Sequence, residues 1–388
     1  MKSPLQRCLR SALALGLAGA ALLAPSASAQ GRPDTVYRLN ERTGKVLAIT
    51  GTVLENSLTK VRVDRSGKES SYDASEIVQI DWGSVPPSYR DGMTYRRKGE
   101  YAEAVDAFRV AATDASTREV VQADARLKAA EALLMLGASD AGQFQEAASE
   151  ADKLVSDFGD SSLVPRARYV AGRALRLSGQ DAAAAAALEA LYNEGSTEPA
   201  TAGYTRRACL EAGLEAAWCY LAAGETLKAR ELFGGAKGGL EMLVGSMGEA
   251  DAASRQAVEA AAGEAAQGEG FCMLAGGQTD QALSFFERTT GRADRPAGAR
   301  FAALLGRGEA LAAKGRHRDA QLCFAEVASL EHSSRDRAAR ALLGLAQSSL
   351  ALGDGDAAGA ARQWLKVVTE SYGDTPAARQ ASEMQGNL

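Results

Sequence analysis

The sequence has few of the side chains on which most enzyme chemistry depends. Its 388 residues include 2 His and 9 Pro, and only 6% are aromatic. Two histidines are too few for a metal cluster or a catalytic relay built from several imidazoles. Scarce proline and aromatic residues also argue against a large β-sandwich. The composition therefore disfavours histidine-based enzymes and large all-β folds.

Catalytic and phosphate-binding motifs are missing as well. His317-Arg318-Asp319 resembles a kinase catalytic loop, but Phe324 stands where that loop needs an asparagine. The Gly-rich stretch 234–239 lacks both a preceding strand and the Gly-Lys-Ser/Thr ending of a phosphate loop. No Cys-x-x-Cys pair occurs. We therefore predict a protein that is not an enzyme and holds no metal or cofactor.

Four cysteines follow the N-terminal segment. Cys209 and Cys219 share one predicted helix, ten residues apart, which is about 15 Å at 1.5 Å per residue. That span is too long for a disulfide. Although an exported protein can carry disulfides, we interpret the cysteines as small buried core residues: Cys209, Cys219, Cys272 and Cys323.

The first 29 residues have the three parts of a secretory signal. Lys2, Arg7 and Arg10 precede the apolar run 11–24, which is short for a membrane span. Ala27-Ser28-Ala29 then offers a small-x-small cleavage site. We expect a Sec-type signal peptide and a periplasmic or other extracytoplasmic protein with no integral membrane segment after cleavage. An uncleaved anchor is the alternative.

The charge balance bears on the partners. The formal net charge is −5, and removal of the three N-terminal cations makes it −8. An acidic protein repels nucleic acid and anionic lipid. We therefore expect no nucleic-acid partner.

Residues 35–82 follow a different pattern from the rest of the chain. Polar and apolar residues alternate in 35–39, 60–65 and 77–82, and 46–54 forms another β-rich run that Gly51 breaks. Four or five short strands in about 50 residues suit a small SH3- or Sm-like barrel. We assign residues 30–87 to this domain, because Pro86-Pro87 cannot continue a ladder.

From residue 88 to 388 the sequence predicts repeated helical hairpins. The full 388-residue sequence contains 80 Ala, the best helix former, and beyond residue 88 glycines recur at intervals of 38 to 53 residues. Glycine suits a helix C-terminus because it adopts left-handed backbone angles readily. The expected turn glycines are Gly99, Gly137, Gly179, Gly224, Gly277, Gly315 and Gly353.

Residues at fixed offsets from these glycines indicate how each hairpin packs. Seven residues before each turn stands Gly or Ala, and nine residues after most turns stands Phe or Leu. Small residues let two helices approach closely, and the large residue fills the gap to the next hairpin. Two turns contain insertions, and counting from Gly355 instead of Gly353 predicts Trp364 as the last large residue. The other large residues are Phe108, Leu188, Phe233, Phe286 and Phe324.

These offsets resemble the tetratricopeptide repeat (TPR) family, for example in residues 92–108 and 311–324. The resemblance implies a mainly α fold, an α-α superhelix of about seven hairpins. Phe158-Gly159-Asp160-Ser161 and Tyr372-Gly373-Asp374-Thr375 are similar to inter-repeat turns of bacterial envelope TPR proteins, such as the Tol-Pal-associated type. In the fourth repeat, glycines between 234 and 248 predict a kinked or frayed helix, or a hinge.

The family resemblance also implies a binding surface. First helices of TPR hairpins line a concave groove, and aromatic and Arg side chains form binding hot spots. We therefore expect a scaffold or adaptor for a protein or peptide partner in the cell envelope. A module that binds the cell wall or another polymer is the alternative. The residues at matching offsets are Tyr89, Arg96, Tyr169, Arg173, Arg176, Trp218 and Phe271.

Overall fold

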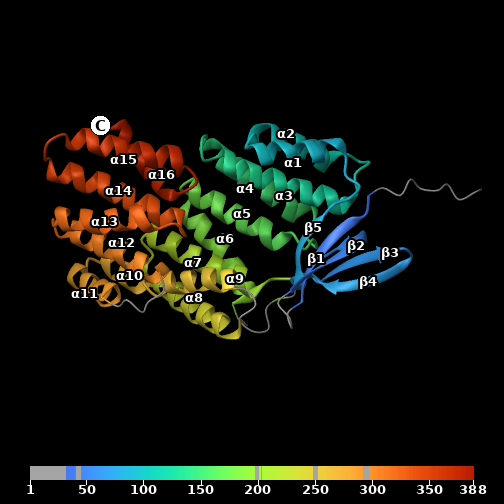
Figure 1. The fold of residues 1–388 in the computed structure, drawn as a ribbon, viewed down its shortest axis with the longest axis horizontal. Coiled ribbons are helices and arrows are strands. Elements are labelled where there is room, and N and C mark those ends of the chain that lie inside the picture. The colour runs from blue at the N-terminus through green and yellow to red at the C-terminus, as the bar shows by residue number, and fades with distance from the viewer. Residues whose placement is uncertain (1–31, 41–44, 197–200, 202, 248–251, 292–296) are drawn as a thin grey trace, which may run out of the picture.

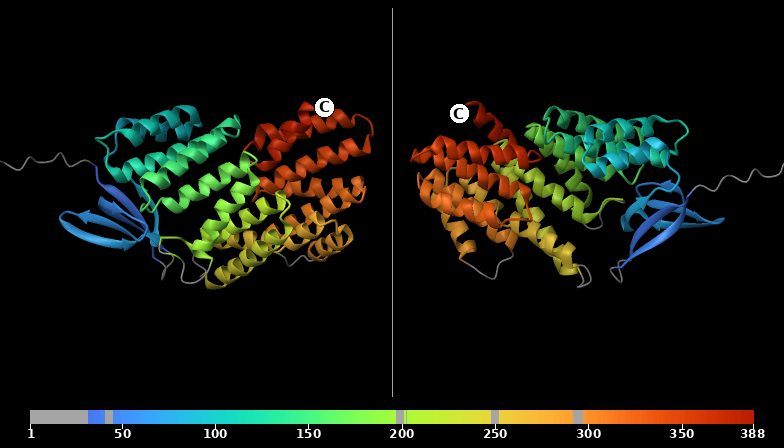
Figure 2. Two further views of the ribbon diagram at one scale, coloured as in Figure 1. Left: turned by 180° about the vertical axis from the view of Figure 1, so that it is seen from behind. Right: turned by 45° about the horizontal axis from the view of Figure 1, so that its top comes forward.

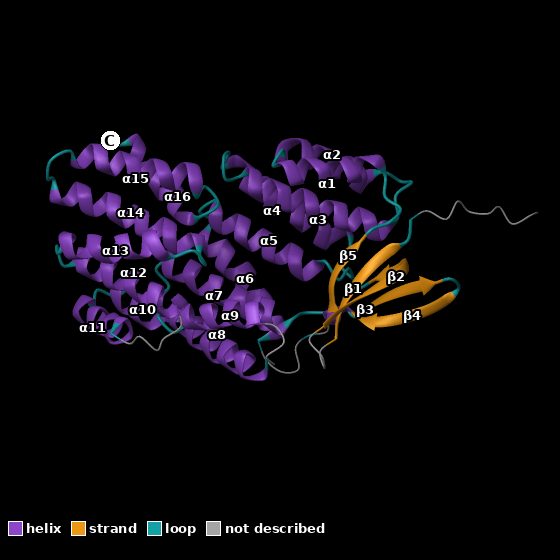
Figure 3. Cartoon of the chain, in the orientation of Figure 1, coloured by secondary structure: helices purple, strands orange, loops and turns teal. Residues whose placement is uncertain are grey.

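The computed structural model describes residues 32–388 apart from 41–44, 197–200, 202, 248–251 and 292–296. The signal peptide expected in residues 1–29 lies outside the described residues. The described chain forms a small β-sheet beside a curved stack of helices (Figures 1 and 3). None of the described helices combines the length and hydropathy of a membrane-crossing segment.

The N-terminal part is a five-stranded antiparallel sheet, which confirms the prediction of a small all-β domain. Valines of three strands form its core, because alternate residues of each strand face the same side: Val36, Val53, Val61 and Val63. The strands are β1 (Asp34–Asn40), β2 (Lys45–Asn56), β3 (Lys60–Arg65), β4 (Lys68–Asp73) and β5 (Ile77–Asp81), in the order β4-β3-β2-β1-β5.

Gly51 does not break the second strand as the sequence suggested. Strand β2 continues through Gly51 and pairs with β1 before it and with β3 after it. A Cβ at Gly51 would lie 2.5 Å from the carbonyl oxygen of Asp64. Glycine thus permits the close approach at which one long strand is shared between the two halves of the sheet.

The helices form seven successive hairpins and a final helix, as the repeat spacing predicts. The first helix of the fifth hairpin is divided into α9 and α10. The bounds are α1 (Pro87–Lys98), α2 (Tyr101–Thr113), α3 (Glu119–Leu136), α4 (Gly142–Asp157), α5 (Val164–Leu177), α6 (Asp181–Gly195), α7 (Arg206–Ala222), α8 (Thr226–Ser246), α9 (Ala252–Ala265), α10 (Gly268–Ala275), α11 (Thr279–Thr290), α12 (Ala297–Ala313), α13 (His317–Leu330), α14 (Arg335–Leu352), α15 (Ala357–Ser371) and α16 (Pro376–Gly386).

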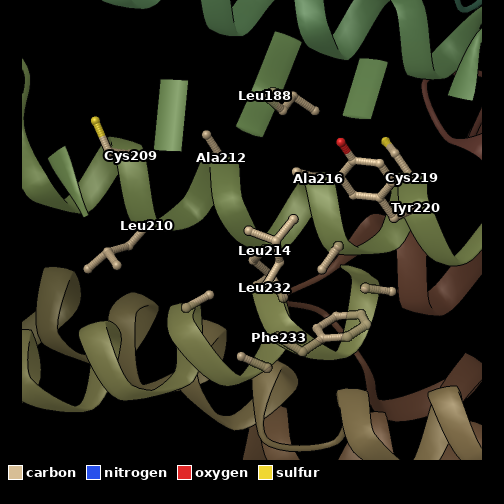
Figure 4. Close-up of a cluster of buried hydrophobic side chains, with 14 of the residues drawn as sticks. Leu188, Cys209, Leu210, Ala212, Leu214, Ala216, Cys219, Tyr220, Leu232 and Phe233 are labelled. Atoms are coloured by element: carbon tan, nitrogen blue, oxygen red, sulfur yellow. The ribbon is translucent and has the colours of Figure 1, made fainter. Parts of the chain in front are cut away.

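The large residues fill gaps between hairpins as predicted. Phe324 of α13 is buried between Gly308 of α12 and Gly344 of α14, and a Cβ at either glycine would lie 2.7 Å from its ring. Phe286 is held in the same way between glycines of α10 and α12. In Figure 4, Leu188 of α6 and Phe233 of α8 approach α7 from opposite sides. Each large residue therefore couples its own hairpin to the next.

Six of the seven predicted turn glycines have the left-handed backbone, with φ between 64° and 83°. Gly137 is the exception, since it is right-handed and caps α3 at φ −55°. Its role is steric, because a side chain there would overlap the ring of Phe144. The last large residue is also displaced by one position. Leu365 is fully buried, whereas Trp364 is 38% exposed.

The glycine-rich segment of the fourth hairpin does not interrupt its second helix, although Gly248 lies outside the described residues. Helix α8 is continuous over 21 residues. Side chains at Gly235 and Gly239 would collide with Tyr192 and Leu210, so these two glycines allow close packing against α6 and α7. The interruption instead falls in the next hairpin, between α9 and α10, at Gln267.

Two polar contacts fix the sheet to the helices. Arg118, just before α3, donates hydrogen bonds to both carboxylate oxygens of Asp34 in β1, each 2.8 Å long. The loop after β2 joins the turn before α5, where the backbone N–H of Leu58 donates to the carbonyl of Asp160 (2.6 Å). The Oγ of Ser162 donates to Asn56 Oδ1 in the same place (2.6 Å).

The four described cysteines are buried and free, as expected from their spacing. Burial raises the pKa of the Cys219 thiol to about 12 and that of Cys209 and Cys272 to about 11.

Candidate protein-binding face

The candidate face is formed by first helices of several hairpins, including α14 of the last hairpin. Helix α14 belongs to the last hairpin, yet its side chains contact α5, α7, α9 and α10. We call the set where these helices meet the inner cluster: Tyr169, Arg173, Arg176, Glu215, Trp218, Glu264, Phe271, Asp336, Arg337 and Arg340.

Glu215 of α7 organises one half of the inner cluster. It accepts hydrogen bonds from the Tyr169 hydroxyl (2.6 Å) and from Arg176 Nη1 (3.1 Å), and Arg173 Nε lies 4.0 Å from it. Burial would raise the pKa of Glu215, but the two guanidinium groups outweigh that effect and hold it below its ordinary value. Burial and the neighbouring carboxylate raise the pKa of Tyr169. Glu215 is therefore charged and Tyr169 neutral at physiological pH.

Aromatic side chains form the other half. Trp218 Nε1 donates to Glu264 Oε1 (2.8 Å), and its ring centroid lies 4.9 Å from that of Phe271. The guanidinium of Arg340 lies over both rings, 4.7 Å from the Trp218 centroid and 5.0 Å from that of Phe271. A cation over aromatic faces is attractive, more so when water is excluded. Arg340 thus joins α14 to α7 and α10.

Arg337 is the most buried cation of the inner cluster. It pairs with Glu264 of α9 and, through Nε, with Glu331 Oε2 at 2.7 Å. Burial would lower the pKa of Arg337, but the two carboxylates outweigh this and raise it. One guanidinium between two carboxylates links the fifth hairpin to the last.

Arg96 lies in a separate group around Glu131 of α3. Arg96 of α1 and Arg166 of α5 each donate to this carboxylate at 3.1 Å, and Lys128 lies 3.5 Å away. Burial opposes ionisation of Glu131, yet the three cations keep its pKa below the ordinary value. This group connects the first helices of hairpins one, two and three.

Tyr89 is buried and belongs to neither group. Its hydroxyl donates to Asp124 Oδ2 (2.5 Å), and its ring packs edge-on against Phe108 at 5.7 Å. Burial, with the Asp124 charge, raises its pKa. Phe271 is also almost fully buried. These two side chains therefore offer little surface, whereas Arg173 is 31% exposed.

The structure brings together five of the seven residues selected from the sequence: Tyr169, Arg173, Arg176, Trp218 and Phe271. Sequence reasoning missed the residues that join them, Glu215, Glu264, Asp336, Arg337 and Arg340. The selected offsets were three, six and ten residues before a turn glycine, but Arg337 and Arg340 precede Gly353 by 16 and 13. The Arg-rich first turn of α14 was the available signal.

Within the described ranges, no three His, Cys, Asp or Glu side chains are grouped so that they could hold a metal ion. Two shallow hollows of about 340 and 450 Å³ lie elsewhere, along α4. The first is lined by Arg109, Arg126, Glu150 and Lys153. Arg109 and Lys153 pair with Glu150, and Arg126 pairs with Asp157. The charged side chains of this hollow are therefore engaged in ion pairs.

Comparison with solved structures gives alignments to helical-repeat proteins at low identity. No protein-family model matches the sequence, and no curated protein matches it significantly. A TPR protein from Parabacteroides merdae aligns over 74% of this chain and 93% of its own, with 14% identity and a TM-score of 0.49. A Rap protein complexed with Competence and Sporulation Factor aligns over 73% of this chain and 76% of its own, with 16% identity and a TM-score of 0.42. The assignment to a TPR-like solenoid with an N-terminal sheet therefore rests on the hairpin packing described above.

Proposed function

We propose that the protein is an exported, non-catalytic scaffold that holds a protein or peptide partner on its inner face. The observation that carries the proposal is the inner cluster, in which Arg and aromatic side chains from four first helices converge. Side chains of these types dominate the energetics of protein interfaces. Because separate helices supply them, a partner that touches the cluster would contact several repeats at once.

The accessible part of this face is charged. Arg173 is 31% exposed, and Arg166 in the group around Glu131 is 55% exposed. Helix α5 carries four arginines and no acidic residue. An acidic or hydrogen-bonding segment of a partner would therefore find donors along α5.

The cellular setting of the proposal comes from the N-terminal sequence. A basic start, an apolar run and a small-x-small site direct a bacterial protein out of the cytoplasm. The similarity of two inter-repeat turns to envelope TPR proteins, including the Tol-Pal-associated type, points to a partner in the periplasm or cell envelope.

Site-specific photo-crosslinking in cells tests this function. A photoreactive residue replaces Arg173 on the inner face, and the matched control carries it at Arg318, which is 78% exposed on α13. We expect a discrete protein adduct at position 173 and none of the same mass at 318. Equal adducts at both positions would contradict the inner-face assignment.

The same experiment distinguishes the protein scaffold from the alternative, a module that binds the cell wall or another polymer. Adducts that are released by cell-wall hydrolases, together with co-sedimentation of the purified protein with cell wall, would favour a polymer ligand. A protein adduct that survives this treatment favours the scaffold.

A further inference from the structure

The last hairpin and the final helix α16 contact the third and fifth hairpins. Asp336 of α14 lies 3.2 Å from Arg176 of α5. Arg379 of α16 lies 3.5 Å from Asp181, the first residue of α6. Both views in Figure 2 agree with Figure 1 in placing the C-terminal helices beside α5. Residues separated by about half the chain thus meet across the inner face.

A backbone contact accompanies these ion pairs. Gly373, in the turn before α16, lies so close to Ala138, in the turn after α3, that a Cβ would overlap the Ala138 carbonyl. Together with the pair between Arg337 and Glu264, these contacts connect the C-terminal helices to the second, third and fifth hairpins. We call this set of contacts the seam: Ala138–Gly373, Asp181–Arg379, Arg176–Asp336 and Glu264–Arg337.

The seam differs chemically from the joints between neighbouring hairpins. Neighbouring hairpins share clusters of buried Ala, Leu and Phe side chains. Among the described residues, no such cluster combines side chains of α5 with those of α14 or α16. Ion pairs must lose their hydration to form, so a charged contact adds less net stability than an apolar one of equal size. We therefore expect the seam to separate before the apolar joints between neighbouring hairpins.

Opening the seam would uncover the inner cluster. Arg176 is only 14% exposed and pairs with Asp336 of α14 as well as with Glu215, and the guanidinium of Arg340 of α14 lies over the Trp218 ring. The same residues that we propose to touch a partner are thus paired within the chain. A partner with carboxylates could replace Asp336 on Arg176, as one charged group exchanges for another.

We propose that the seam is an autoinhibitory latch, in which the last hairpin occupies the partner-binding face until a partner displaces it. The inference rests on the proposed function, because it assigns regulation to that same face. A partner that binds only the open form pulls the equilibrium toward it by its difference in affinity for the two forms.

Charge reversal tests the latch. The seam variant carries Asp336→Arg and Arg379→Glu, so that like charges face each other at two points. The matched control carries Asp354→Arg and Arg318→Glu, which reverse an exposed pair (2.9 Å) on the second-helix side with the same change in charge. Small-angle scattering gives the radius of gyration, hydrogen exchange reports on α14, and far-UV circular dichroism checks helix content.

We expect the seam variant to expand and the amides at the start of α14 to exchange at least about tenfold faster, with helix content unchanged. The control should match the wild type in all three measurements. An unchanged radius and unchanged exchange in a helical seam variant would overturn the latch. Neither measurement requires a partner, so the latch can fail while the proposed function stands.

If the seam variant loses its fold, a protein with the seam cross-linked shut provides the second test. Cysteines replace Asp181 and Arg379, and a bis-maleimide joins them. The buried native cysteines stay unreactive under these conditions. We expect the lock to suppress the partner adduct at position 173, whereas equal adduct yields before and after locking would overturn the proposal. Absence of any adduct at 173 in every form would instead contradict the proposed function.

Discussion

Arg118 holds Asp34 by two hydrogen bonds of 2.8 Å, and this pair helps to join the β-sheet to the second helical hairpin. Asp34 is fully buried, and its carboxylate also accepts from the backbone N–H groups of Val53 and Gly83, both at 2.8 Å. The guanidinium of Arg118 lies over the Trp82 ring as well, 5.6 Å from its centroid. A bidentate Arg–carboxylate contact fixes the relative orientation of the two groups as well as their distance. The pair therefore helps to orient the sheet on the solenoid.

Removal of Arg118 should destabilise this joint. In Arg118→Ala the buried Asp34 carboxylate keeps its backbone donors but loses its cation, and loss of one partner of a buried pair costs about 3 kcal/mol or more. We expect a lower urea midpoint for the sheet. Arg62→Ala, which removes solvent-accessible pairs with Glu55 (2.8 Å) and Glu69 (3.3 Å), is the control and should cost less than about 1 kcal/mol. Equal midpoints for the two variants would contradict the prediction.

The same joint should weaken in acid. Burial alone would raise the pKa of Asp34, but the hydrogen bonds from Arg118, Gly83 and Val53 outweigh burial and lower it. A carboxyl group whose pKa is lower in the folded state contributes stability at pH above its unfolded value of about 3.9, and that stability is lost as pH falls through the folded value. The free energy of unfolding, measured between pH 7 and 2, should therefore decrease below a pH of about 4. The decrease should be smaller in Asp34→Asn. If stability fell equally with pH in the wild type and in Asp34→Asn, Asp34 would not be the cause of the acid sensitivity.

The repeat architecture could be predicted because its determinants are local. A turn glycine, a small residue seven positions before it and a large one nine after it act within one hairpin and its neighbour. Gly308, Gly315 and Phe324 occupy the expected places. Helix α8 was misjudged because helix propensity penalises each glycine, whereas the contacts of Gly235 and Gly239 with Tyr192 and Leu210 decide the outcome.

The candidate site was only partly predictable for a different reason. The offsets identified Arg176 and Trp218 on single helices. Their partners Asp336 and Arg340 lie more than 100 residues away. Whether the last hairpin returns to the third depends on a small rotation per repeat that accumulates along the stack. No local sequence pattern determines this accumulated rotation. The contact between α5 and α14 could therefore be identified only from the three-dimensional structure.

The buried thiols should resist modification in the folded protein. Burial raises the pKa of Cys219 to about 12 and that of Cys272 to about 11, and the thiolate is the reactive form. At pH 8 we expect a thiol reagent to label the mature protein far more slowly than in urea, where all four cysteines react. Rapid stoichiometric labelling of the native protein would show that these cysteines are accessible.

Alanine substitutions at two adjacent glycines of α8 should change the stability of the protein in opposite directions. A Cβ at Gly238 meets no atom within 4 Å, so Gly238→Ala should stabilise the helix by up to about 1 kcal/mol through propensity alone. A Cβ at Gly239 would collide with the Leu210 side chain, and overpacking of this kind costs about 1–3 kcal/mol. Gly239→Ala should therefore lower the melting temperature, while Gly238→Ala raises it. Each variant is the control for the other, since both add one methyl group to the same helix. A stabilised Gly239→Ala would mean that α8 does not pack closely against α7 and that the glycine-rich segment is set by propensity after all.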